Sequence, residues 1–466
     1  MLYFSKDAPR LAFATPSVQL AALGVALFLS GLGAQGLALA LESIPPNLLD
    51  DPGTLIEISS AFRNVGAALL ASASLATVLA LVIRWKATDS QRMRIMVRRG
   101  LFDYSMGNPL HLKEGERLPS VRCRETGLGS YEIVVGVAAS RVEDISNVSS
   151  SSSISASLSG RFESFAVTQT DIDVAFNSVT FAVEDVTIDR SLYCDSVEDL
   201  RSGKPHILAV QRGASIDLST SGSMLVAGKT RSGKTTGIIA LLLQALLAGP
   251  DDHSSRVTII DPKRAELSQL PHVVTLDADG GGRAVLDALR DFADSATERQ
   301  AYLNTLARER GDAVKWWDAG LHVSLLFIDE YVSARTIFPP RASKDDPDYC
   351  LATFDNLVKR IVTMGASAGC YVIVSIAEAS VESGGLPAML RSAMSTKVLF
   401  RPTLPEARLM WDAEKVRDMP ARTYGPGDAW FSSTDGIHDR VSFVHFPVMS
   451  FPVYGEMGRL LNLYYS

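Results

Sequence analysis

Two long apolar runs dominate the N-terminal part of the chain. Residues 11–41 contain no charged side chain, and residues 64–83 form a second uncharged run. A helix needs about 20 mainly apolar residues to cross the hydrocarbon core of a bilayer. Both runs meet that requirement, and we therefore predict transmembrane helices over residues 17–41 and 63–85.

The charges that flank these runs are unevenly distributed. Lys6 and Arg10 precede the first run, and the loop over residues 42–62 is mainly acidic. A set of basic residues follows the second run, opposed only by Asp89: Arg84, Lys86, Arg92, Arg94, Arg98 and Arg99. Because basic flanks stay in the cytoplasm, we expect a multi-pass protein of the plasma membrane with residues 1–16 inside and the loop outside. A cleaved signal peptide and a pair of soluble core helices are the alternatives, but the first run exceeds a typical signal-peptide apolar region.

The segment over residues 95–200 is polar and mixed. Tyr131–Val137 and Val179–Val183 are rich in β-branched and aromatic residues and are predicted strands. Between them the five serines Ser149–Ser153 predict a solvated loop tip. Nothing in this segment has catalytic spacing, and we interpret it as a small α+β adaptor domain between the membrane and the rest of the chain.

Short apolar runs alternate with helical patterns after residue 205. The predicted strands are Ser223–Ala227, Val257–Ile260, Val323–Ile328, Tyr371–Ile376 and Lys397–Phe400. A helix over Thr236–Leu247 follows the first strand and stops at Gly249-Pro250. Continuous apolar strands are typical of a parallel sheet buried on both faces. The pattern predicts a RecA-like α/β domain over residues 205–466.

Composition narrows the function classes. A chain of 466 residues suggests about three domains, and 47% hydrophobic against 21% charged residues excludes a disordered chain. The net charge of −7 excludes a protein that is basic overall, so a nucleic acid would have to be held locally. The four cysteines (Cys123, Cys194, Cys350 and Cys370) form no CxxC pair, which argues against a zinc site or a disulfide framework.

The first predicted strand of this domain leads into a phosphate-binding motif. Gly228–Thr235 reads G-x-x-x-x-G-K-T, the P-loop pattern. Glycines let backbone N–H groups surround the phosphates, Lys234 supplies positive charge to the β- and γ-phosphates, and Thr235 offers its hydroxyl to Mg²⁺. The expected ATP-binding residues are Gly228, Lys229, Thr230, Arg231, Ser232, Gly233, Lys234, Thr235 and Thr236.

Two carboxylates end the third predicted strand. Asp329 and Glu330 follow Val323–Ile328 at the end of the strand where such sheets bind ligands. We expect Asp329 to hold the Mg²⁺ shell together with Thr235, and Glu330 to polarise the attacking water. The alternative is two surface carboxylates with no chemistry. With Lys234 as the third catalytic residue, the pattern indicates a P-loop ATPase that uses ATP and Mg²⁺.

Several segments in this half of the chain resemble FtsK/SpoIIIE-type DNA translocases. The most specific is D-P-K-R-A-E-L-S over Asp261–Ser268, and the others follow in the family's order: Leu270–Thr275, Glu298-Arg299, Ser367–Gly369, Thr396–Phe400, Arg408 and Gly425–Asp428. The resemblance covers roughly residues 205–440. It implies a hexameric ring that hydrolyses ATP and moves double-stranded DNA through its central pore. Because phosphate contacts carry no sequence information and no winged helix is expected, we predict that DNA binding is not sequence-specific.

The arrangement of the chain is similar to one branch of that family. Two membrane runs replace the usual four, no long low-complexity linker is present, and the stretch after Trp430 is too short for a winged helix. This resembles the FtsK-related coupling proteins of Gram-positive conjugative elements, which hand DNA and its relaxase to a transfer channel. A chromosome or plasmid DNA pump, a protein-secretion ATPase and a slowly hydrolysing ring subunit are the alternatives.

The family's motifs are incomplete in two places. Its R-A-A-G box reads Ala366–Gly369, which removes an arginine that would act in trans, and its A-T-Q-R-P segment reads Ser375–Ala379, with Ala377 in place of a phosphate-sensing glutamine. Such an arginine supplies roughly 10³–10⁵ in rate. Possible substitutes are Arg360, Arg391 and Arg408. For each of them, an ordinary surface or DNA-facing arginine is the alternative.

Overall fold

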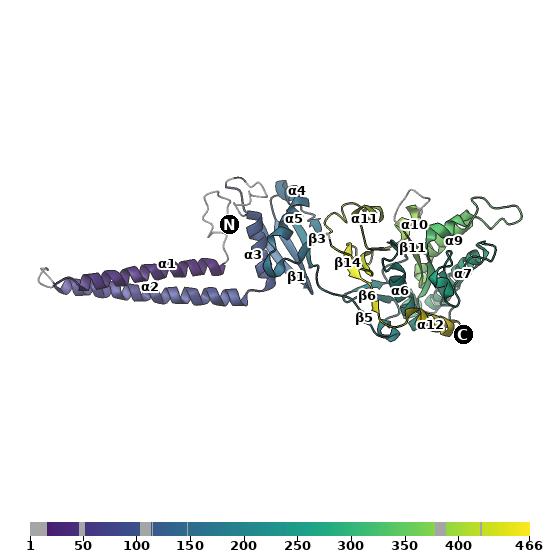
Figure 1. Cartoon of the computed structure of the whole chain (residues 1–466), viewed down its shortest axis with the longest axis horizontal. Coiled ribbons are helices and arrows are strands. Elements are labelled where there is room, and N and C mark those ends of the chain that lie inside the picture. Colours follow the sequence, from purple (N-terminus) through teal and green to yellow (C-terminus); the bar gives the residue numbers. More distant parts are fainter. Residues whose placement is uncertain are drawn as a thin grey trace. The chain divides into compact units, whose positions relative to one another are not determined.

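The computed structural model describes residues 16–45, 52–102, 113, 115–146, 148–377, 388–419 and 422–466. The chain divides into two compact units, of which the first ends at Ile188 and the second begins at Asp189. Figure 1 shows the elements of each unit along the chain.

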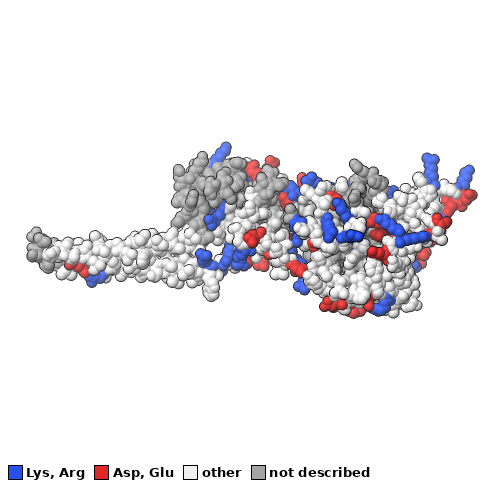
Figure 2. Space-filling view, in the orientation of Figure 1, with Lys and Arg blue, Asp and Glu red and all other residues white. Residues whose placement is uncertain are grey.

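Helices α1 (Pro16–Glu42) and α2 (Pro52–Lys86) form a hairpin at the start of the first unit. Small residues allow the two helices to approach closely, since a Cβ on Gly31 would lie 2.9 Å from the side chain of Leu70. The outward leucines are exposed, and Figure 2 shows few charged side chains along the pair. Both helices are long and apolar enough to cross a membrane. Helix α2 begins well before residue 63, because residues 54–62 continue its run without a helix breaker.

The rest of the first unit is an antiparallel sheet covered by helices. Among the described residues the sheet has four strands in the order β1-β2-β4-β3. These are β1 (Ser120–Gly127), β2 (Ser130–Gly136), β3 (Phe165–Ile172) and β4 (Ser178–Asp185), with helices α3 (Asp89–Phe102), α4 (Val142–Ser146) and α5 (Val148–Ser157). Val97 of α3 and Ile133 and Phe181 of the sheet are fully buried in one core. The prediction of a small α+β domain is confirmed.

The prediction of a loop at the five serines was wrong. Ser149–Ser153 lie in helix α5. Ile154 in the same helix is fully buried, and Ser155 Oγ accepts a hydrogen bond from the Val167 backbone N–H at 3.1 Å. Packing of this helix against β3 therefore outweighs the weak helix propensity of serine.

The second unit is built on a sheet that has seven strands within the described residues, in the order β14-β13-β12-β8-β11-β10-β9. Its parallel strands are β8 (Met224–Gly228), β9 (Val257–Ile260), β10 (Ser324–Ile328), β11 (Cys370–Ile376) and β12 (Thr396–Phe400). Strands β13 (Asp428–Ser433) and β14 (Ser442–His445) continue the sheet in antiparallel fashion. The predicted RecA-like α/β class is confirmed, whereas the two antiparallel strands were not predicted.

Helices and short strands complete the second unit. The helices are α6 (Lys234–Ala248), α7 (Arg283–Arg310), α8 (Tyr331–Thr336), α9 (Leu351–Met364), α10 (Ala388–Ala393), α11 (Leu404–Met410) and α12 (Val453–Tyr465). The short strands are β5 (Tyr193–Cys194), β6 (Ile207–Gln211), β7 (Ala214–Asp217) and β15 (Val448–Met449). Short 3-10 helices of this unit cover Val197–Leu200, Glu266–Gln269, Trp316–Asp318 and Gly365–Ala368, and two more in the first unit cover Ala139–Arg141 and Gly160–Phe162. Helix α6 is buried along almost its whole length, which fixes the direction of its N-terminus.

Candidate nucleotide site

The P-loop connects β8 to α6 at the carboxyl end of the parallel strands. Gly233 takes the left-handed conformation, with φ +90°, directly before the helix. A Cβ on this residue would lie 2.4 Å from the backbone nitrogen of Gly427, which donates a hydrogen bond to the Ser232 carbonyl at 3.0 Å. Only glycine fits between the loop and the turn that supports it.

That supporting turn is the Gly425–Asp428 segment. The Asp428 carboxylate accepts a hydrogen bond from the Gly425 N–H at 2.6 Å, and its other oxygen lies 2.6 Å from Nδ1 of His445. Burial alone would raise the pKa of Asp428, but the hydrogen bonds from His445 and Gly425 outweigh burial and lower it. An ionised carboxylate therefore fixes the turn against which the P-loop rests.

Lys234 and Glu330 meet at the centre of the site. The Lys234 ammonium lies 3.0 Å from Glu330 Oε1 and donates a second hydrogen bond to the Ile376 carbonyl at 3.3 Å. Glu330 has the left-handed conformation, with φ +46°, and its N–H donates to Ser375 Oγ at 2.9 Å. The structure thus brings these two predicted catalytic residues into direct contact.

Asp329 lies beside them and is almost completely buried. Its Oδ1 accepts a hydrogen bond from Ser375 Oγ at 2.6 Å, and burial is the main reason that its pKa is raised. Thr235, in the first turn of α6, is partly exposed. A carboxylate and a hydroxyl are the oxygen donors that Mg²⁺ accepts in phosphate sites, so both residues fit the ion that the P-loop implies.

The three arginines considered for a role in trans are distributed over three helices. Arg360 on α9 donates to Thr297 Oγ1 at 2.9 Å, and Arg391 on α10 donates to the Leu409 carbonyl at 3.3 Å. Arg408 on α11 is exposed. Within the described part of the chain, none of the three forms a hydrogen bond or ion pair with the P-loop.

Two groups at the site were not assigned a role from the sequence. Ser375 is a polar residue inside an otherwise apolar strand, which is the signal that could have revealed it. Lys263 belongs to the D-P-K-R motif, and its ammonium lies 3.6 Å from Glu330 Oε1. Ala377 follows the strand whose last carbonyl binds Lys234. The last two residues of the Ser375–Ala379 segment, Glu378 and Ala379, lie outside the described residues.

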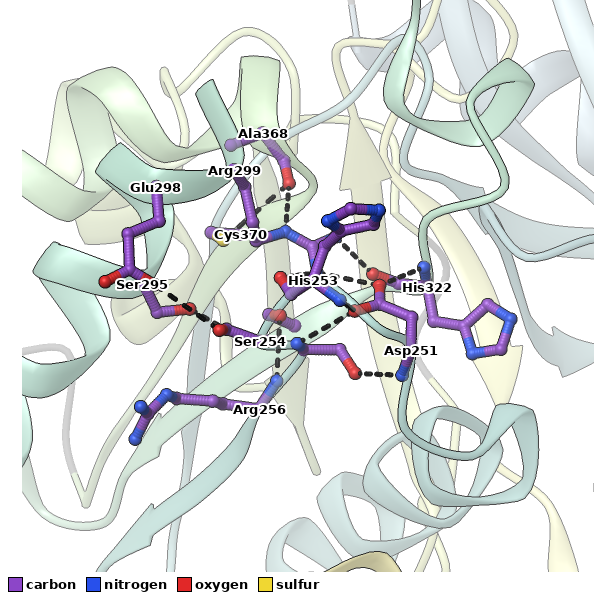
Figure 3. A network of polar contacts seen from close by, with 12 residues as sticks. Asp251, His253, Ser254, Arg256, Ser295, Glu298, Arg299, His322, Ala368 and Cys370 are labelled. Atoms are coloured by element: carbon purple, nitrogen blue, oxygen red, sulfur yellow. Dashed lines mark hydrogen bonds and ion pairs between the residues drawn. The ribbon is translucent and has the colours of Figure 1, made fainter. Parts of the chain in front are cut away.

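The Glu298-Arg299 pair lies near the amino ends of β9, β10 and β11, whereas the P-loop lies at the carboxyl ends of the strands. Figure 3 shows the contacts around Arg299. Arg299 is completely buried and donates to Asp251 Oδ2 at 2.9 Å and to the Ala368 carbonyl at 2.8 Å. Asp251 also accepts the backbone N–H groups of His253, Ser255 and His322. This network joins the segments that enter β9, β10 and β11. Its role in the fold is to hold those segments in place, away from the P-loop.

A family comparison covers the P-loop part of this site. Residues 185–319 match the model of the FtsK/SpoIIIE family. This stretch includes the P-loop and the D-P-K-R motif. The resemblance inferred from the sequence is therefore confirmed for this part of the chain.

Two curated relatives agree with that match. The FtsK-domain-containing protein YdcQ of Bacillus subtilis is 26% identical over 152 residues, which cover 32% of this chain and 28% of the relative. The DNA translocase FtsK of Helicobacter pylori strain J99 is 24% identical over 232 residues, which cover 47% and 25%. The chain thus spans about a quarter of the length of these relatives.

Solved structures with a similar fold include a conjugation coupling protein and a pair of ATPase domains. The pCW3 conjugation coupling protein TcpA, in its monomer form with ATPgS, is 13% identical with a TM-score of 0.46, covering 80% of this chain and 99% of that one. EssC ATPases 2 and 3 from Geobacillus thermodenitrificans are 16% identical with a TM-score of 0.42, covering 60% and 52%.

Proposed function

We propose that this chain is a membrane-anchored, ATP-driven DNA motor, because residues 185–319 match the FtsK/SpoIIIE family model and contain the P-loop. In this proposal it feeds DNA, together with its relaxase, into a conjugative transfer channel. The observation that carries the proposal is the Lys234–Glu330 pair, formed where the P-loop meets the carboxyl end of β10.

The arrangement of these groups suggests how hydrolysis proceeds. The Lys234 ammonium lies 3.0 Å from Glu330 Oε1 and forms an ion pair with that carboxylate. ATP phosphates offer Lys234 a denser negative charge, so the lysine pairs with them and releases Glu330. The freed carboxylate then orients and polarises the water that attacks the γ-phosphate. Bound Mg²⁺, held by Thr235 and Asp329, would neutralise charge on the β- and γ-phosphates.

Membrane anchoring is the second part of the proposal. The exposed apolar faces of α1 and α2 would lie in the bilayer, and Trp85 is 82% exposed beside Arg84 and Lys86. Tryptophan and basic residues at one end of an apolar helix are typical of a cytoplasmic membrane interface. The ATPase domain would then lie in the cytoplasm, with the loop between the two helices outside.

DNA is the proposed substrate because the Helicobacter relatives are named DNA translocases. We infer a homohexameric ring with DNA in its pore. A ring also gives Arg360, Arg391 or Arg408 a neighbour's nucleotide to reach, since none of them contacts the P-loop of its own chain among the described residues. The net charge of −7 makes a local, salt-sensitive grip on phosphates necessary.

A mating assay tests the role in conjugation. Deletion of the gene from its element should reduce transfer by orders of magnitude, and complementation with the wild-type chain should restore it. The Lys234→Ala chain should insert in the membrane and fail to restore transfer. Normal transfer after deletion, with a defect in DNA segregation instead, would favour the chromosome or plasmid pump.

Hydrolysis measurements separate DNA motors from protein-export motors. Duplex DNA should stimulate ATP hydrolysis by the purified full-length chain. Hydrolysis that ignores DNA and responds to a secreted protein would favour the secretion ATPase.

A further inference from the structure

Glu330 is shared by two lysines rather than one. Lys263 Nζ lies 3.6 Å from Glu330 Oε1, and Lys234 Nζ lies 3.0 Å from the same oxygen. The two lysines differ in environment, because the side chain of Lys234 is 8% exposed and that of Lys263 is 47% exposed. One carboxylate oxygen thus holds a buried cation and a half-exposed cation together.

A dedicated turn places Lys263 at this position. Asp261, at the end of β9, is completely buried, and its carboxylate accepts N–H groups from Lys263 at 3.1 Å, Ala265 at 2.8 Å and Ser268 at 3.1 Å. Arg264 has the left-handed conformation, with φ +51°, and its guanidinium donates to the Leu276 carbonyl at 2.9 Å. The turn is therefore held on both sides of Lys263 while the lysine side chain stays free to extend.

Sheet order brings this turn to the catalytic carboxylates. Strands β9 and β10 are parallel neighbours, and the Asp329 N–H donates to the Ile260 carbonyl at 2.9 Å. The residues after β9 and the residues after β10 consequently emerge side by side. Lys263 approaches Glu330 from the β9 side, whereas Lys234 approaches it from the P-loop.

A contribution to folding stability does not explain this contact. A half-exposed lysine at 3.6 Å from a carboxylate adds little to folding stability, because solvent screens the pair. The contact also brings two ammonium groups to one oxygen, which is favourable only while the carboxylate lies between them. Once ATP draws Lys234 toward the phosphates, Lys263 is the remaining cation next to Glu330 among the described residues.

We infer that Lys263 is a positioning residue that holds the Glu330 carboxylate in place for hydrolysis after Lys234 has moved to the nucleotide. The inference rests on the proposed ATPase function. It assigns the D-P-K-R turn a task within the same active site, and it does not require Lys263 to touch the nucleotide.

The experiment compares ATP hydrolysis without DNA by the full-length chain and by three variants in detergent. Lys263→Met keeps the length of the side chain and removes its charge, Lys263→Arg keeps the charge, and Lys204→Met removes an exposed lysine elsewhere in the second unit. Steady-state kinetics give kcat and KM, ATPγS titration gives nucleotide affinity, and thermal unfolding verifies the fold of each variant.

We expect Lys263→Met to lower kcat by about 10- to 100-fold, because small displacements of a catalytic group have effects of that size. The KM and the ATPγS affinity should stay within about threefold of wild type. Lys263→Arg should recover most of the lost kcat, and Lys204→Met should match wild type.

Three results would overturn the inference. A wild-type kcat for Lys263→Met would show that Glu330 needs no positioning by this lysine. A loss of nucleotide affinity that matches the loss of kcat would place Lys263 on the phosphates instead. A wild-type chain that binds ATP and does not hydrolyse it would overturn the proposed function and this inference together.

Discussion

The parallel strands of the second unit have a cation paired with a carboxylate at each of their two ends. The two pairs differ in their contacts. At the amino ends of β9, β10 and β11, the Arg299 guanidinium donates to Asp251 and to backbone carbonyls, and Asp251 accepts three backbone N–H groups. At the carboxyl ends, beside the P-loop, one oxygen of Glu330 pairs with two lysine ammonium groups.

The difference indicates which pair can change partners. Separation of Arg299 from Asp251 would leave buried charges and several backbone groups without partners, so this pair is permanent in the folded chain. Separation of Lys234 from Glu330 leaves Glu330 with Lys263, and phosphate oxygens can take the place of Glu330 at Lys234. The Arg299–Asp251 network therefore stabilises the fold, whereas the Lys234–Glu330 pair can exchange partners during the reaction.

The largest expected effect is the loss of ATP hydrolysis when the Lys234–Glu330 pair is removed. Lys234→Ala should reduce ATP hydrolysis to background, because no other described lysine lies at the same point of the P-loop. Its melting temperature should fall by only a few degrees, since Lys263 still compensates Glu330. Measurement of hydrolysis and thermal unfolding on one preparation tests this, and a variant that keeps a tenth of wild-type turnover would contradict it.

Removal of the Arg299–Asp251 pair should mainly reduce the stability of the fold. Arg299→Leu should lower the free energy of unfolding by about 3–5 kcal/mol, because it leaves the buried Asp251 uncompensated. Urea denaturation of the full-length chain in detergent measures the change. As a matched control, Arg459→Leu removes an exposed arginine from its pair with Glu456 and should cost under about 1 kcal/mol. Equal losses in the free energy of unfolding for both variants would show that the buried pair contributes no more to stability than the exposed one.

Ser375 offers an intermediate case, because one hydroxyl serves both catalytic carboxylate residues. It donates to Asp329 Oδ1 and accepts the Glu330 N–H. Ser375→Ala should cost about 1–3 kcal/mol of stability, since two buried groups lose their partner. Turnover should fall more than nucleotide affinity. Unchanged turnover in a folded Ser375→Ala chain would mean that neither carboxylate needs this support.

The smallest effect concerns acid stability. The pKa of Asp251 is lowered: burial alone would raise it, but Arg299 and backbone N–H groups outweigh burial. An unfolded aspartate has a pKa of about 3.9, so this stabilisation is present above that pH and is lost as the pH falls through the folded value. Asp251→Asn should therefore flatten the loss of stability as the pH falls below about 3.9. Asp287→Asn, at an exposed position, should leave the curve unchanged.

Much of the second unit could be predicted from the sequence. Strands β8–β12 are almost uniformly apolar, and the P-loop motif fixed the first strand and the first helix. Strand β13 begins at an aspartate and ends in two serines, so its pattern did not indicate a strand. The helix at the serine run depends on packing of Ile154, which no local pattern reveals.

The candidate site was predictable in its parts and not in its contacts. Lys234 and Glu330 were each assigned from a motif, but their ion pair joins residues 96 positions apart. The contacts of Ser375 and Lys263 depend on the order β11-β10-β9, which places three separate strand ends next to one another. Sequence spacing alone does not give that order.

The measurement that tests the central claim most directly is ATP hydrolysis by the membrane-reconstituted full-length chain, with and without duplex DNA, for wild type and Glu330→Gln. The account predicts that DNA stimulates wild-type hydrolysis, and that Glu330→Gln binds ATPγS within about threefold of wild type while turnover falls to background. Wild-type turnover by Glu330→Gln, or hydrolysis that is indifferent to duplex DNA, would contradict it.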